Sequence, residues 1–172
     1  PPIEESWPKL SPEPRVTIYM PCFNCEDYVV ESIESALNQT YKNIEICIHD
    51  DGSTDNTLKI IKKKYRFNRK VKISSGKNGG IGHASNSSIK NGSGELILQL
   101  DSDDILSPTA IEKLIPMMRE NVVCSYGSFI RVDPDGEKID DGWDWPIYSR
   151  PRLLRSMIVH HPRLFRRDAW EY

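Results

Sequence analysis

Three short apolar runs in this sequence each lead directly into a polar cluster, and segments of helical periodicity separate them. The runs 16–20, 44–48 and 95–100 are rich in β-branched and other apolar residues, as strands are. Strands that alternate with helices at this spacing form parallel sheets through right-handed crossovers. The sequence therefore predicts an α/β fold, a Rossmann-like sandwich whose central, mainly parallel sheet is flanked by helices.

The other elements are predicted from periodicity and from the residues that begin and end them. Pro21 should end the first strand, Thr54 should cap the helix after the second, and Pro108 should begin the last helix. The spacing of apolar residues predicts helices over 27–38, from 54 past 61, over 78–91 and over 108–119, and further strands over 71–73 and 122–132.

Length and charge limit the number of domains and the kinds of partner. The 172 residues suffice for one core, so we expect a proline-rich extended arm or linker over 1–14 and a single domain over 15–172. The net charge of −2 lacks the basic excess of a nucleic-acid-binding protein, and no nucleic acid is expected as a partner. No apolar run is long enough to span a membrane, which favours a cytoplasmic domain. The sequence leaves open the possibility that a parent protein carries a membrane tether elsewhere.

The four cysteines do not form a convincing framework. Cys22 and Cys25 make a lone CxxC, which is typical of half a zinc site or of a redox pair. Because no second CxxC is present, four reduced thiols are the favoured interpretation.

Aspartates gather where the second and the last of the three strands end. In parallel sheets, ligands bind at the carboxyl ends of the strands. Crowded carboxylates repel one another unless a cation lies between them, and oxygen ligands favour Mg²⁺ or Mn²⁺. The alternative is that these residues cap helices or form turns. For Asp104 this alternative explains the residue at least as well as metal binding does. The aspartates concerned are Asp50, Asp51, Asp101, Asp103 and Asp104.

Other candidates for phosphate or metal binding are weaker. The glycine-rich stretch 78–82 precedes a helix and could hold a phosphate, although a turn with close backbone packing explains it equally well. Lys77 could supply a point charge to a diphosphate. The neighbouring His160 and His161 are candidate metal ligands, of which at most one is expected at a given site because adjacent strand residues face opposite ways. His49 and His83 are interpreted as structural.

Taken together and in order, the motifs resemble those of family 2 glycosyltransferases of the GT-A fold. They are Pro21-x-x-Asn24-x-x-x-Tyr28, Ser35-Ala36-Leu37-Asn38-Gln39-Thr40, Asp50-Asp51-Gly52-Ser53-Thr54-Asp55-Asn56-Thr57, Asn78-Gly79-Gly80 and Leu100-Asp101-Ser102-Asp103-Asp104. The later part narrows the resemblance to the N-acetylhexosamine-transferring domain of bacterial chondroitin polymerases and their hyaluronan-synthase relatives. It contains Asp133-x-Asp135-Gly136, Asp141-Gly142-Trp143-x-Trp145-Pro146 and Met157-Ile158-x-His160-His161.

The resemblance implies a role for each matching position. The loop of Pro21, Phe23 and Asn24 would hold the uridine. Asp51 would accept a hydrogen bond from the uracil imide. Lys77 would lie near the base or the diphosphate. Asp101-Ser102-Asp103 would be the DxD motif, in which Asp101 faces the ribose and Asp103 binds Mn²⁺ or Mg²⁺. His160 or His161 would be a further metal ligand.

The reaction implied is transfer of a sugar with inversion. The donor would be a UDP-sugar, UDP-GalNAc or UDP-GlcNAc, and the acceptor a glycan or a lipid-linked saccharide. The aromatic rings of Trp143 and Trp145 would wall the sugar pocket or belong to the core.

One departure from the family pattern concerns the catalytic base. After His161 only Asp168 and Glu171 carry carboxylates, and neither stands in a matching motif. We therefore expect a C-terminally truncated domain that binds its donor without efficient transfer, with the base beyond Tyr172. Two alternatives remain, a catalytically silent UDP-binding or scaffolding domain and a nucleotidyltransferase. The latter would need a glycine-rich loop after the first strand, where this chain has Pro21-Cys22-Phe23-Asn24.

Overall fold

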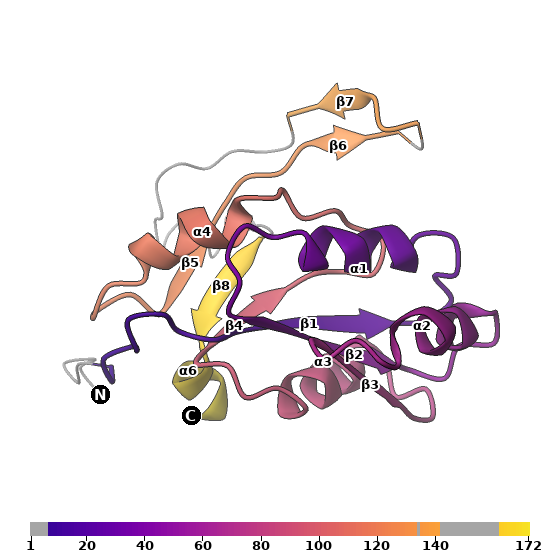
Figure 1. Ribbon diagram of the computed structural model, residues 1–172, viewed down its shortest axis with the longest axis horizontal. Helices are drawn as coiled ribbons and strands as arrows, with labels where there is room; N and C mark the ends of the chain where they lie inside the picture. Colours follow the sequence, from indigo (N-terminus) through magenta and orange to yellow (C-terminus); the bar gives the residue numbers. More distant parts are fainter. Residues whose placement is uncertain (1–6, 134, 142–161) are drawn as a thin grey trace.

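A six-stranded sheet in the order β3-β2-β1-β4-β8-β5 forms the centre of the structure, a computed structural model that describes residues 7–133, 135–141 and 162–172 (Figure 1). Four neighbouring strands are parallel and the last two pairings are antiparallel. This arrangement confirms the mainly parallel sheet. The strands are β1 (Val16–Cys22), β2 (Ile44–Asp50), β3 (Val71–Ser75), β4 (Leu96–Gln99), β5 (Cys124–Tyr126) and β8 (Arg163–Arg166).

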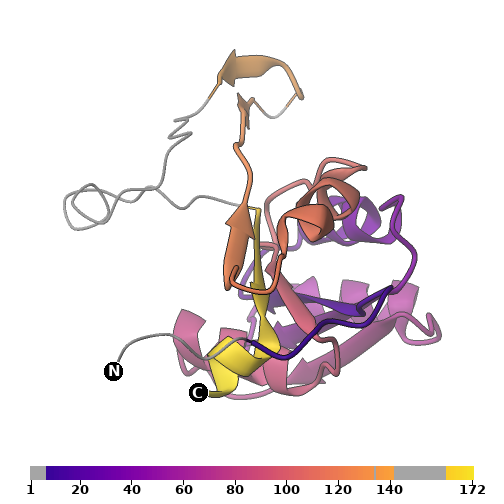
Figure 2. The ribbon, with the colours of Figure 1, turned by 90° about the vertical axis from the view of Figure 1, so that its left-hand side faces the viewer.

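Helices cover both faces of this sheet (Figure 1, Figure 2). All residues of β1 and β2 are buried, as expected for central strands with helices on either side. One face packs against α1, α2 and α4 in the larger core cluster, and the other packs Tyr19 and Ile97 against α3 and α6. The helices are α1 (Val29–Leu37), α2 (Thr57–Tyr65), α3 (Ile81–Lys90), α4 (Ala110–Leu114) and α6 (Arg167–Glu171).

The expected end of the first strand at Pro21 is wrong, because β1 continues to Cys22. Pro21 has no N–H to donate, but β4 pairs with β1 only as far as Tyr19 and Gln99. On the opposite side, the Cys22 carbonyl accepts the N–H of Asp51 at 2.8 Å. The proline therefore stands in a central strand where no hydrogen bond is lost.

The four predicted helices each begin two or three residues later than expected, and the hydrogen bonds explain two of these differences. Thr54 does not cap α2, which begins at Thr57 after Asn56, because the carboxylate of Asp55 accepts the N–H of Thr57 at 2.9 Å and holds the chain in a turn. Helix α3 begins at Ile81 rather than at 78, because Gly79 and Gly80 belong to a loop described below.

The segment after β4 also differs from expectation. The helix expected over 108–119 is α4 followed by a 3₁₀ turn, Ile115–Met117, that contains Pro116. The strand expected over 122–132 is two strands in different sheets. Its first part is β5, and its last part, β6 (Arg131–Val132), pairs with β7 (Lys138–Asp140) in a hairpin set apart from the main sheet (Figure 2).

The described part of the N-terminal arm, residues 7–14, lies against the domain. The guanidinium of Arg166, which is only 1% exposed, donates to the Pro8 carbonyl at 2.7 Å. The Ser11 N–H donates to the Glu95 carboxylate at 2.9 Å. This part of the arm is thus held by hydrogen bonds to β8 and to a residue beside β4.

The described helices are short, and the longest of them, α3, has 10 residues. Over the described ranges of the chain, none combines the length and apolar character that a bilayer crossing requires.

Candidate functional site

The carboxyl ends of β1, β2 and β4 meet at one edge of the sheet, as their parallel pairing requires. A pocket of about 310 Å³ opens there. It contains most of the predicted donor-site residues, so the sequence placed them correctly at one edge. The lining residues are Pro21, Cys22, Phe23, Asp51, Asn78, Gly80, Ile81, Ala84, Asp101, Ser102 and Asp103.

The loop after β1 is tied to the loop after β2 by Asn24. Its carboxamide oxygen accepts the N–H of Thr54 at 2.8 Å, and its own N–H donates to the Ser53 hydroxyl at 3.0 Å. Asn24 adopts a positive φ of 50°, which asparagine tolerates better than most residues. It does not line the pocket but fixes the loop that presents Phe23, whose ring is 48% exposed beside it.

Asp51 is a buried carboxylate that holds the glycine-rich loop. It accepts the N–H of Gly79 at 3.0 Å and that of Gly80 at 2.8 Å, and its Oδ1 lies 3.3 Å from Nδ1 of His83. Burial alone would raise the pKa of Asp51, but the two backbone donors and His83 outweigh it and hold the pKa below the usual range. Asp51 is therefore ionised at neutral pH.

The two loops approach each other so closely that glycine is needed. Gly52 has a φ of +77°, and a Cβ placed there would lie 2.9 Å from the backbone nitrogen of Asn78. The N–H groups of Gly79 and Gly80 point to Asp51, which favours the turn interpretation of the glycine-rich stretch over a phosphate cradle.

The aspartates after β4 supply a set of oxygen ligands. Asp101 and Asp103 line the pocket, and Asp101 also accepts a hydrogen bond from the Gln99 carboxamide at 3.0 Å. The pKa of Asp104 is raised to about 6, by desolvation first and then by the negative charges of Asp101 and Asp103. A bound cation would reduce the electrostatic repulsion between these carboxylates, and an all-oxygen donor set fits Mg²⁺ or Mn²⁺.

The two cysteines beside the pocket are free thiols, as are the other two. A hydrogen bond from the Cys22 thiol is the largest of the effects that lower the pKa of Cys25 to about 7, and it outweighs burial. The structure thus agrees with the interpretation of reduced thiols, and it places this CxxC beside the predicted nucleotide loop.

The remaining predicted residues fall outside the pocket or outside the described chain. Lys77 is exposed and does not line the pocket, although its neighbour Asn78 does. His160 and His161 lie outside the described residues, as do Trp143 and Trp145.

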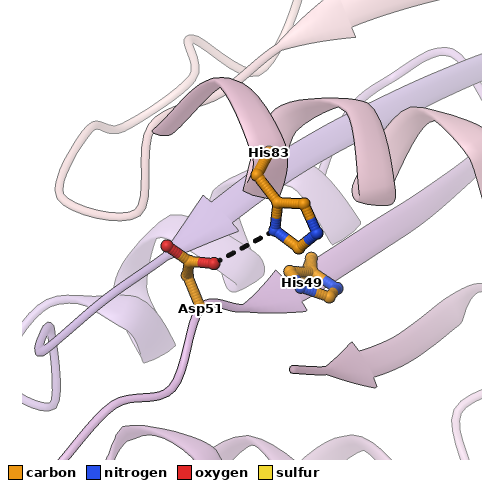
Figure 3. Close-up of side chains that lie close together, drawn as sticks. All are labelled: His49, Asp51 and His83. Atoms are coloured by element: carbon orange, nitrogen blue, oxygen red, sulfur yellow. Dashed lines mark hydrogen bonds and ion pairs between the residues drawn. The ribbon is translucent and has the colours of Figure 1, made fainter. Parts of the chain in front are cut away.

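Two histidines that the sequence assigned to structural roles flank Asp51 (Figure 3). His49, at the end of β2, and His83, in the first turn of α3, have ring centroids 5.6 Å apart. Ligand atoms of His49, Asp51 and His83 all lie within 4.8 Å of one another. The only signal in the sequence was the spacing of His49 and Asp51, which places both on one side of the chain. Nothing local placed His83 beside them.

The fold and the pocket define an α/β domain with an acidic pocket at the carboxyl ends of its parallel strands, and the comparison with known families assigns that domain to a family. The family model Glycosyl transferase family 2 matches residues 17–171, and the chain belongs to that family. It is 46% identical over 159 residues to chondroitin synthase from Escherichia coli. This alignment covers 91% of this chain and 23% of the relative. It is 44% identical over 171 residues to hyaluronan synthase from Pasteurella multocida, covering 98% of this chain and 17% of the relative. The chain thus spans about a fifth of the length of these relatives.

Solved structures confirm the GT-A type of fold. S. aureus TarS 1-349 in complex with UDP-GlcNAc superposes with a TM-score of 0.56 at 31% identity, over 60% of this chain and 31% of TarS. The mannosyltransferase PcManGT from Pyrobaculum calidifontis, in complex with GDP-Man and Mn²⁺, superposes with a TM-score of 0.69 at 18% identity. That match covers 98% of this chain and 50% of the mannosyltransferase, and at this identity it bears on the fold alone.

Proposed function

We propose that this domain binds a UDP-sugar in the pocket at the ends of β1, β2 and β4, as the donor half of a metal-dependent, inverting glycosyltransferase. The observation that carries the proposal is the convergence of Asp51, Asp101 and Asp103 on one pocket next to the exposed ring of Phe23. The UDP-GlcNAc complex of TarS supports a UDP-sugar donor. The relatives that make chondroitin and hyaluronan support an N-acetylhexosamine, GalNAc or GlcNAc, and a glycan or lipid-linked saccharide as acceptor.

The uridine would lie between the loop after β1 and the glycine-rich loop. Pro21 and Phe23 offer apolar contacts to it, and Asn24 holds that loop in place through Thr54. A carboxylate has about four acceptor positions, and Gly79, Gly80 and His83 engage only part of those on Asp51. Asp51 therefore keeps the capacity to accept the uracil imide N–H. Lys77, in the exposed segment next to Asn78, would lie near the base or the diphosphate.

The diphosphate would lie over the aspartates that follow β4. Asp103 would hold Mn²⁺ or Mg²⁺, Asp101 would face the ribose, and Ser102 would line the floor between them. When bound, the metal supplies charge stabilisation to the UDP leaving group. His160 or His161, outside the described residues, would add a ligand.

Deprotonation of the acceptor hydroxyl requires a base within hydrogen-bond reach. The carboxylates after His161, Asp168 and Glu171, lie in α6, and neither lines the pocket. We therefore expect these 172 residues to bind the donor without efficient transfer.

Replacing Asp103 tests the proposal. In the chain with Asp103→Ala, we expect the binding of UDP in the presence of Mn²⁺ to weaken more than 10-fold, roughly the effect of disturbing a metal ligand. Asp104→Asn is the matched control, because it removes the same charge from a neighbour that does not line the pocket. Isothermal titration of UDP into both variants would contradict the assignment if Asp103→Ala left metal-dependent binding unchanged.

A further inference from the structure

The imidazole of His49 carries an unexplained polar atom. The residue is 6% exposed, and among the described residues its Nε2 has no hydrogen-bond partner. A buried polar atom without a partner is costly, and in native proteins it commonly marks the position of a bound water or ion.

The hydrogen bonds on the other side of the ring are compatible with the tautomer that a metal needs. The Ser74 hydroxyl lies 3.2 Å from the Ile48 carbonyl and accepts from the Asn91 carboxamide at 2.7 Å. When the hydroxyl donates to that carbonyl, it accepts the N–H of Nδ1 of His49 at 2.8 Å, and Nε2 presents its lone pair. Metal-bound histidines in proteins usually show this arrangement, in which the second nitrogen donates to a neighbouring acceptor.

The side chains of Asp51 and His83 lie beside His49 (Figure 3). The three ligand atoms lie within 4.8 Å of one another. In tetrahedral geometry, Zn–N bonds of about 2.0–2.1 Å place the ligand atoms of one ion about 3.4 Å apart. The three side chains would therefore have to close by as much as about 1.4 Å around an ion. Asp51 is fixed by the loop glycines, whereas the His83 side chain is 53% exposed, so His83 is the ligand that would move.

We propose that His49, Asp51 and His83 form a second metal site, for a zinc-like transition-metal ion, distinct from the site at Asp103. Two imidazoles and one carboxylate suit zinc, which commonly takes three protein ligands and leaves a fourth position open. Mg²⁺ prefers oxygen ligands and keeps several waters, so it does not compete for this set. Donor type would therefore separate the two metals, although Asp51 belongs both to this cluster and to the lining of the pocket.

Titration of Zn²⁺ into the 172-residue chain without nucleotide and with excess Mg²⁺ tests this site. The excess Mg²⁺ saturates the oxygen ligands around Asp103. We expect one zinc ion per chain and a loss of affinity of more than 100-fold in His49→Gln and His83→Gln, larger than the effect of removing an outer hydrogen bond. Ser74→Ala, which removes only the acceptor for Nδ1, should weaken zinc binding about 10-fold. Because His83 is exposed, its replacement does not endanger the fold.

Two control variants locate the ion. Asp103→Asn should bind zinc as the parent chain does, and so should Cys25→Ser, which disrupts the CxxC. The proposal is overturned if the parent chain takes up no zinc, if His83→Gln binds it equally well, or if either control variant loses it. Because nucleotide is absent throughout, none of these results bears on UDP binding.

Discussion

The anchoring of the glycine-rich loop by Asp51 can be tested by the isosteric change Asp51→Asn. The carboxylate accepts two backbone N–H groups, from Gly79 and Gly80. Hydrogen bonds to a charged acceptor contribute roughly 1.5–3 kcal/mol each, whereas neutral ones contribute about 0.5–1.5 kcal/mol. Oδ2 of Asp51 accepts both N–H groups, at 3.1 Å from Gly79 and 2.8 Å from Gly80, so an asparagine oxygen at that position keeps both bonds but without the charge, and each bond falls from the charged to the neutral range.

The expected loss follows from these values and from the exposure of the loop. Gly79 and Gly80 are exposed, so water replaces part of what is lost and the lower end of each range applies. The net cost is about 2 kcal/mol, which corresponds to about a 30-fold change in an equilibrium constant. We expect the amide of Gly80 to exchange with solvent about 30-fold faster in Asp51→Asn, through local opening of the loop.

Hydrogen exchange measured by NMR in the native state is the assay. Asp55→Asn is the matched control, because Asp55 also caps a backbone N–H, that of Thr57, but does not contact the glycine-rich loop. Unchanged protection of Gly80 in Asp51→Asn, or equal loss in both variants, would refute the reasoning.

The same contact also depends on pH. Because the folded pKa of Asp51 lies below its ordinary value of 3.8, the stabilisation of the glycine-rich loop by Asp51 is complete above that pH. It is lost only as the pH falls through the lower folded value.

Further predictions concern the core and the pocket. Glu45 is 5% exposed and accepts from the Thr17 hydroxyl and the Gly94 N–H, while its partner Lys72 is half exposed, so Glu45→Gln should lower the free energy of unfolding in urea by about 2 kcal/mol. Burial opposes ionisation of Glu45, but the hydrogen bonds it accepts prevail and lower its pKa to about 2. Its contribution to stability is thus complete above about pH 4.5 and is lost as the pH falls toward 2, which thermal melts at stepped pH would follow. If zinc and the uracil imide both use Asp51, zinc should weaken UDP binding to the Mn²⁺-loaded chain at least 5-fold, and His83→Gln should abolish that effect in competition titrations.

The central sheet could be predicted from the sequence because its pattern is strong and local. The strands β1, β2 and β4 are rich in apolar residues, broken only by Thr17 in β1 and by Glu45 and His49 in β2 before their ends, and the structure buries nearly all of their residues. Once those strands are parallel, the polar residues that follow each one must meet at the same edge. The meeting of Asp51, Asp101 and Asp103 at one edge could be predicted from the sequence for this reason.

The features that the sequence did not predict depend on contacts between distant residues. Helix α3 begins late because the N–H groups of Gly79 and Gly80 are bound by Asp51, from a different strand end. Strand β8 enters the main sheet between β4 and β5, a position that its four residues do not encode by themselves. The meeting of His49 and His83 likewise depends on the close approach of Gly52 to Asn78, which only the folded chain creates.

The most direct test of the account is isothermal titration of UDP into this chain, with and without Mn²⁺. The account predicts saturable binding of one UDP per chain that requires the metal, because Asp103 would bridge the diphosphate only through the ion. Absence of binding in both conditions, or binding that ignores Mn²⁺, would contradict the donor site at the ends of β1, β2 and β4.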